Sequence, residues 1–134
     1  MTPIETVQHL YAAFGRGDIS TILAGLAEDV EWDHDAFPNP VPWLQPLRGR
    51  DQVPRFFQAL ADNVEMNVFA PKMFFADGLT VVDLVDVEFT VRATGKRVID
   101  SDVVHLWRFN ERGLVQRFRQ RADTWQSAMA LRAD

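Results

Sequence analysis

The 134-residue sequence contains no cysteine, which excludes disulfide bonds, thiolate catalysis and cysteine-based zinc sites. It has no apolar run near the length that a membrane-spanning helix needs and no signal-peptide pattern, so a cytoplasmic location is expected. An excess of positive charge is also absent, because the net charge is −5 and the sequence pI is about 5.1. We therefore expect neither a membrane nor a nucleic acid as partner.

Tyrosine is scarce among the aromatic residues: there is one tyrosine against ten phenylalanines and four tryptophans. Such side chains fill a core, and they also line ligand pockets. With 47% apolar and 25% charged residues, the composition is that of a folded globular protein. The length is sufficient for one domain with a single core, so residues 1–134 are expected to form one domain.

The first half of the chain has helical patterns. The sequence TPIE at residues 2–5 is a capping-box pattern, which predicts a helix that runs to about Phe14. Asp18 is placed to cap a second, shorter helix, and Asp51 to cap a third. A brief strand is predicted near residues 30–35, before a proline-rich stretch that is expected to form the rim of a pocket.

The second half has the pattern of long strands and turns. Strands are expected near residues 64–76, 79–92, 96–109 and 114–123, followed by a short helix from Thr124 to about Leu131. The turn sequences DG, TG and NERG separate the strands. Helices followed by a strand meander predict an α+β domain, with helices on one face of a curved antiparallel sheet.

Side chains on the expected strands divide into inward and outward sets, because alternate residues of a strand share a face. In the strand near 96–109, Asp100 and Asp102 are expected to point outward, which turns Ser101, Val103, His105 and Trp107 inward. The arginines at 117, 119 and 121 share an outward face, where Asp102 is expected near Arg121. Cross-strand ion pairs explain these arginines better than a nucleic-acid stripe does.

Two histidines each lie two residues from a tryptophan, in the sequences WDH and HLW. If both strands point these side chains inward, His34 and His105 face the same interior together with Trp32 and Trp107. A single buried histidine is more often structural, but two on facing surfaces indicate a pocket. The orientation of Asp83 stays open, since simple alternation turns it inward, as a candidate base, whereas a bulge would turn it outward.

Three stretches together resemble a known family: YAAFGRGDISTILAGLAEDVEW, PLRGRDQVPRFFQAL and DVVHLWRFNERGLVQRFRQRADT. In order and spacing they are similar to the ketosteroid isomerase and SnoaL-type polyketide cyclase branch of the nuclear transport factor 2-like superfamily. The resemblance covers nearly the whole chain. It implies a cystatin-like, cone-shaped roll of three N-terminal helices packed on a strongly curved antiparallel sheet, an apolar pocket, and a homodimer formed through the convex sheet face.

The resemblance also implies roles for individual residues. The oxyanion-hole tyrosine of the isomerases falls on Tyr11, and their second oxyanion donor, an aspartic acid, falls on His105. Their general-base aspartate falls on His34 or, with a one-residue slip, on Asp33 or Asp35. Histidine thus stands at both carboxyl positions, which departs from the isomerase pattern but retains groups capable of acid–base chemistry.

The sequence therefore predicts a cofactor-independent acid–base enzyme of the isomerase, cyclase or hydratase type that acts on a small hydrophobic carbonyl compound. The alternative is a non-catalytic module of the same fold that binds a hydrophobic molecule or dimerises. No metal site is expected, because no close ligand spacing supports one. The catalytic candidates are Tyr11, His34 and His105, and the pocket-lining candidates are Trp32, Asp35, Phe56, Phe57, Val87, Phe89, Val103, Trp107, Phe118 and Gln120.

Overall fold

The computed structural model describes residues 1–34 and 38–134. In chain order its elements are α1 (Pro3–Gly15), α2 (Ile19–Ala24), β1 (Leu26–Asp33), the 3-10 helix η1 (Pro42–Leu44), β2 (Leu47–Arg48), α3 (Pro54–Asn63), β3 (Val64–Asp77), β4 (Thr80–Val91), β5 (Arg97–Phe109), β6 (Val115–Arg121) and α4 (Thr124–Ala130). None of the helices among these residues is long and apolar enough to cross a membrane.

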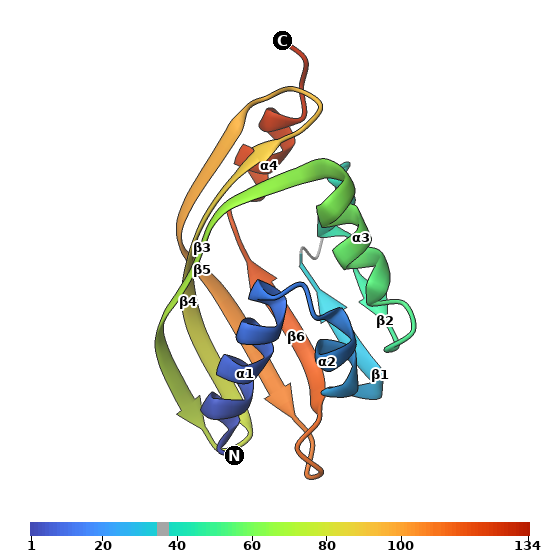
Figure 1. The fold of residues 1–134 in the computed structure, drawn as a ribbon, viewed down its shortest axis with the longest axis vertical. Helices are drawn as coiled ribbons and strands as arrows, with labels where there is room; N and C mark the ends of the chain where they lie inside the picture. The colour runs from blue at the N-terminus through green and yellow to red at the C-terminus, as the bar shows by residue number, and fades with distance from the viewer. Residues whose placement is uncertain (35–37) are drawn as a thin grey trace.

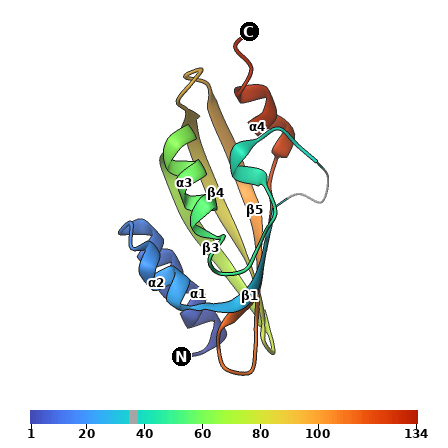
Figure 2. The same cartoon turned by 90° about the vertical axis from the view of Figure 1, so that its right-hand side faces the viewer.

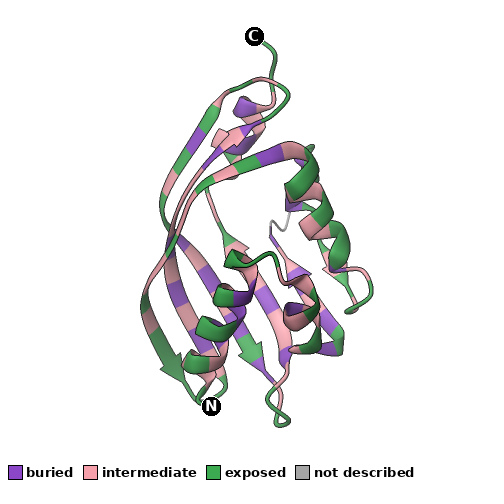
Figure 3. Ribbon diagram, in the orientation of Figure 1, coloured by how far each residue is buried: buried purple, intermediate pink, exposed green. Residues whose placement is uncertain are grey.

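Helices α1, α2 and α3 lie on one face of a curved sheet (Figures 1 and 2). Helix α4 packs against the N-terminal part of β5. The α+β architecture predicted from the sequence is confirmed. Buried residues gather on the inner face of the sheet and on the helix sides that face it (Figure 3). The main core cluster joins α1 residues Val7 and Leu10 to Trp32, Trp107 and Phe118 of the sheet.

The sheet has six strands in the order β2-β1-β6-β5-β4-β3 and is mixed rather than purely antiparallel. The prediction of an all-antiparallel sheet is wrong for one pair, since β1 runs parallel to β6. Tight turns force antiparallel pairing on consecutive strands, as between β3, β4, β5 and β6. Most of the chain separates β1 from β6, so no turn sets their relative direction.

Side-chain caps begin two of the helices as predicted. The Thr2 hydroxyl accepts a hydrogen bond from the Glu5 N–H at 3.1 Å, and the Glu5 carboxylate accepts one from the Thr2 N–H at 2.9 Å. Asp18 likewise caps α2, accepting from the Thr21 N–H at 3.2 Å. These bonds satisfy backbone donors that the first turn of a helix leaves free.

The predicted cap of the third helix by Asp51 is wrong, because α3 begins at Pro54 with Val53 as its cap residue and no side-chain cap. A backbone turn precedes the helix, with the Val53 N–H bonded to the Arg50 carbonyl at 3.3 Å. The Phe56 N–H in turn donates to the Val53 carbonyl at 2.9 Å. Backbone carbonyls therefore satisfy these donors, and Asp51 is not needed as a cap.

The predicted outward orientation of Asp100 is wrong, because β5 contains a bulge. Val85 pairs with Val103 but Val87 pairs with Asp100, so two residues of β5 lie opposite the single Asp86 of β4. Asp102 adopts a left-handed backbone, with φ of 59°. The extra residue reverses the alternation: Asp100 shares the inner face with Val87, and Ser101 is exposed rather than inward.

The outward arginines of β6 contact β1, not the acidic residues of β5. Arg117 and Arg119 lie 3.2 and 3.7 Å from the Asp33 carboxylate. Arg121 donates to the His34 carbonyl at 2.8 Å. The predicted pairing of Asp102 with Arg121 is therefore wrong, because Asp102 forms its ion pair with a lysine of β3, at 2.7 Å.

Candidate active site

A row of polar side chains crosses the inner face of the sheet. His105 on β5 lies directly opposite Asp83 on β4 and Gln120 on β6. Directly paired residues share a face, so these three side chains point to the same interior. His34, the residue that follows β1, extends the row one position beyond the last registered pair between β1 and β6. The simple alternation of β4 continues through Asp83, which is fully buried.

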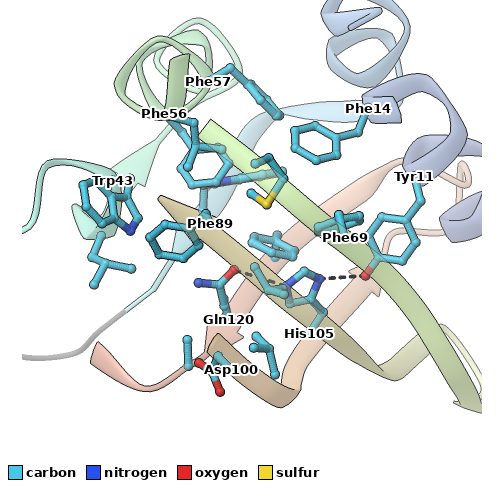
Figure 4. Close-up of a pocket in the computed structure, with 18 of the residues that line it drawn as sticks. Tyr11, Phe14, Trp43, Phe56, Phe57, Phe69, Phe89, Asp100, His105 and Gln120 are labelled. Carbon is cyan, nitrogen blue, oxygen red and sulfur yellow. Dashed lines mark hydrogen bonds between the residues drawn. The ribbon is translucent and has the colours of Figure 1, made fainter. Parts of the chain in front are cut away.

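Tyr11 of α1 points its hydroxyl group toward His105 (Figure 4). Its hydroxyl donates to Asp83 Oδ2 at 2.6 Å and lies 2.7 Å from His105 Nδ1. The indole N–H of Trp107 donates to the same hydroxyl oxygen at 3.2 Å. On the other side of the imidazole, His105 Nε2 lies 3.1 Å from Gln120 Oε1.

The protons of this chain can be placed by counting donors. A hydroxyl has one proton, and Tyr11 gives it to the carboxylate of Asp83. His105 must then carry its proton on Nδ1 in order to donate to the Tyr11 oxygen. In the neutral ring this leaves Nε2 as an acceptor, whereas the observed Gln120 Oε1 contact matches a protonated Nε2. Turning the amide over would offer its NH₂ group to the neutral ring.

Burial sets the charge states of these groups. Burial lowers the pKa of His105 to about 4. It raises the pKa of Asp83 to about 6, although the hydrogen bond from Tyr11 acts to lower that pKa. Burial and the nearby Asp83 charge raise the pKa of Tyr11, so it keeps its proton. At neutral pH the chain therefore consists of an aspartate, a neutral tyrosine and a neutral histidine.

The chain opens onto an apolar pocket between the helices and the sheet (Figure 4). The cavity volume is about 100 Å³. That is several times the space that one ordered water needs. Among the sequence candidates, the residues that line it are Tyr11, Trp32, Phe56, Phe57, Val87, Phe89, Val103, His105, Trp107, Phe118 and Gln120.

Sequence reasoning missed several residues of the pocket wall. Phe14 lies one helical turn beyond Tyr11, a spacing that could have indicated it. Phe69 lies on β3, where a bulge between Met66 and Val68 breaks the alternation that would have shown its orientation. Asp100 was assigned to the outer face because the bulge in β5 has no clear mark in the sequence.

His34 is buried, with 2% of its surface exposed, but it is not among the residues that line the pocket. Its ring stacks on Phe56 at 4.7 Å between centroids, and neither nitrogen has a hydrogen-bond partner among the described residues. Burial, with a smaller effect of His105, lowers its pKa to about 3. Of the alternative bases, Asp33 pairs outward with Arg117, and Asp35 lies outside the described residues.

Ionic ligands have few partners in this part of the structure. No lysine or arginine is among the described residues that line the pocket. Over residues 1–34 and 38–134, no group of three or more histidine, aspartate or glutamate side chains is arranged to hold a metal ion. The described lining consists mostly of aromatic and aliphatic side chains, with a few polar groups.

Comparison with protein families gives a match to the SnoaL-like domain over residues 7–118. No curated protein matches the sequence. Among solved structures, an NTF2-like protein of unknown function from Burkholderia pseudomallei is 30% identical, with a TM-score of 0.86 and 98% of each chain covered.

Two further structures are similar to this chain. TerC, co-crystallised with polyporic acid, is 28% identical with a TM-score of 0.79, and the match covers 92% of each chain. An LEH-like epoxide hydrolase from M. tuberculosis is 18% identical with a TM-score of 0.72, over 96% of this chain and 88% of that one. At that identity the likeness shows the fold alone.

Proposed function

Because this chain belongs to the family of SnoaL-like domain proteins, we propose that it is a cofactor-independent acid–base enzyme acting on a small hydrophobic carbonyl compound. One observation carries the proposal: the hydrogen-bonded chain from Asp83 through Tyr11 ends at a neutral histidine in the wall of an apolar pocket. The similar TerC has been co-crystallised with polyporic acid, which supports a small organic molecule as the ligand.

In this proposal His105 is the general base. Its Nε2 removes a proton from the carbon next to the substrate carbonyl, and the ring becomes an imidazolium. The Nδ1–H then donates more strongly to Tyr11, whose own proton is held by the Asp83 carboxylate. The Gln120 oxygen accepts from the new Nε2–H, as its position 3.1 Å away allows. The proton can be returned to a second carbon, which completes an isomerisation.

Tyr11 has a different role here from the oxyanion donor that the resemblance implies. Its single proton is given to Asp83, so it positions His105 rather than donating to the substrate. Once Nε2 is protonated, Oε1 of Gln120 faces His105 and the NH₂ group is free, so we assign this NH₂ group as the donor to the developing enolate oxygen.

The experiment is hydrogen–deuterium exchange of the methyl protons of an aryl ketone, 4-acetylbiphenyl, followed by proton NMR in D₂O. We expect the protein to accelerate exchange and His105→Asn to lower the rate by about 100-fold or more, the typical contribution of a general base. His9→Gln is the matched control, because His9 is exposed on α1.

Four results would contradict the proposal or change it. Exchange no faster than in buffer, or unchanged exchange in the His105→Asn variant, contradicts it. Loss of exchange in a His34→Asn variant alone would move the base to His34. Binding of the ketone without exchange would favour the alternative of a hydrophobic binding module.

The homodimer and the cytoplasmic location stay predictions.

A further inference from the structure

The bulge in β5 brings the carboxyl group of Asp100 into the pocket wall, apart from the chain of Asp83, Tyr11 and His105. Asp100 pairs directly with Val87 and lines the pocket with it. Without the extra residue at Asp102, strict alternation from His105 would turn Asp100 to the outer face. Bulges recur beside binding sites, where they redirect a side chain.

The backbone that redirects Asp100 is held from the outer face. Asp102 has φ of 59°, a conformation that an aspartate adopts at some cost. Its N–H donates to Asp86 Oδ1 at 3.1 Å, and its carboxylate lies 2.7 Å from the Lys72 ammonium group. The same ammonium group lies 2.9 Å from Asp86. A cluster on the far side of the sheet thus fixes the geometry that points Asp100 inward.

The Asp100 carboxylate has capacity to bind a further donor. Among the described residues only the backbone N–H of Asp123 donates to it, at 2.7 Å to Oδ2. No lysine or arginine lies with it among the residues described as lining the pocket. Its neighbours in that wall include apolar Val87 and Phe89 and the hydroxyl-bearing Ser127 of α4. Within residues 1–34 and 38–134, no hydrogen-bond donor contacts Oδ1 of Asp100, which lies in the wall of the apolar pocket.

We propose that Asp100 determines specificity by accepting a hydrogen bond from a hydroxyl group at the end of the substrate remote from the carbonyl. The inference rests on the proposed function only in taking a carbonyl as the group that faces His105. The substrate class is therefore an elongated, uncharged hydroxy ketone with ring systems between its two polar ends.

The spacing along β5 sets the length of such a molecule. Five residue steps separate Asp100 from His105 in the strand. At about 3.3 Å per residue this gives roughly 16 Å as an upper limit, which the bulge shortens. A biphenyl with substituents at both para positions is of that order of length, and aromatic side chains of α3 and the sheet face the space between.

The test is isothermal titration calorimetry with three probes: 4-acetyl-4′-hydroxybiphenyl, 4-acetylbiphenyl and the cationic 4-acetyl-4′-(aminomethyl)biphenyl. We expect the wild-type protein to bind the hydroxylated ketone about tenfold more tightly than 4-acetylbiphenyl, since the acceptor is a charged group in a partly buried place. Asp100→Asn should reduce this ratio to about threefold or less.

Asp100→Asn keeps a side-chain oxygen for the Asp123 N–H, so the contact with α4 can persist, and a thermal melt verifies folding. Asp77→Asn is the matched control, an exposed aspartate at the end of β3. An unchanged ratio in Asp100→Asn, a preference for the cationic probe, or no binding of any probe would overturn the inference.

The two proposals fail in different ways. Selective binding of the hydroxylated ketone without deuterium exchange would leave the role of Asp100 standing and remove the proposed enzyme activity. Deuterium exchange without selective binding of the hydroxylated ketone would leave the proposed enzyme activity standing and remove the role of Asp100.

Discussion

At the scale of single residues, the site depends on where one tyrosine proton lies. Tyr11 contacts Asp83, His105 and Trp107 through one oxygen atom. Such buried polar chains stabilise a structure only when each member has a partner. The sequence predicted that Tyr11 and His105 share an interior, but it did not predict that Asp83 would be the acceptor, because its orientation depended on whether β4 contains a bulge.

Replacing Tyr11 with phenylalanine tests this chain. The change leaves the Asp83 carboxylate and the Trp107 indole N–H without their partner, which should destabilise the protein by about 1–3 kcal/mol. Because His105 also loses the group that positions it, ketone exchange should fall by more than the change in folded fraction explains. Urea unfolding and exchange rates measured on the same samples check both. Unchanged values of both would show that the hydroxyl has no such role.

The pH dependence of exchange tests the charge state of Asp83. Burial raises the pKa of Asp83 to about 6, so its carboxylate is lost as the pH falls through that value. His105 stays neutral down to about pH 4. The rate should therefore rise with pH around a midpoint near 6, and Asp83→Asn should remove that rise. A midpoint that persists in the variant would assign the titration to another group.

At the scale of elements, most strands were predictable and the bulges were not. Alternation of apolar and polar residues gave β4 its correct inner face at Val85, Val87, Phe89 and Val91, and left the orientation of Asp83 open. In β5 the same rule failed on the N-terminal side of Val103. The left-handed residue Asp102 adds one position to the strand there, and no glycine in the sequence marks it. The direction of β1 against β6 was missed for a related reason, since only distant contacts determine it.

Paired substitutions of Asp102 test the backbone geometry of β5. Glycine adopts the observed φ without steric cost, so Asp102→Gly should change stability by less than about 1 kcal/mol even though an exposed ion pair with Lys72 is lost. A β-branched residue is strained there, so Asp102→Val should cost about 1–3 kcal/mol. Urea unfolding of the two variants gives the comparison. Equal stability of the two would contradict a left-handed residue at this position.

At the scale of the whole molecule, the fold encloses two histidines that must stay neutral. The helices-then-strands order predicted the architecture, and the family resemblance predicted the pocket. Neither showed that His34 would lie behind Phe56 instead of in the pocket wall, because that depends on how α3 packs on β1.

These histidines make the stability depend on pH. Burial lowers the pKa of His34 to about 3 and of His105 to about 4, from an ordinary value of 6.5. Between pH 6.5 and 4 the unfolded chain binds protons that the folded chain cannot, so stability is lost as the pH falls. Asp83, whose pKa is raised, acts in the opposite direction but is a single group.

Replacing His34 with phenylalanine should remove part of this acid sensitivity. The variant keeps a ring against Phe56 and has no nitrogen to protonate. We expect the loss of unfolding free energy between pH 7 and 4 to be smaller than in the wild type by about 2–3 kcal/mol. Urea unfolding at the two pH values measures it, with His9→Gln as the control. An equal loss in both proteins would mean that His34 is not kept neutral by burial.

The most direct test of the proposed site is the nitrogen-15 NMR spectrum of the imidazole rings at neutral pH. We expect the resonances of His105 to show a neutral ring whose proton is bound to Nδ1 and whose Nε2 is unprotonated. A neutral ring protonated on Nε2 would mean that Tyr11 donates to His105 instead of Asp83. Either that ring or a cationic one would mean that the pocket contains no free base.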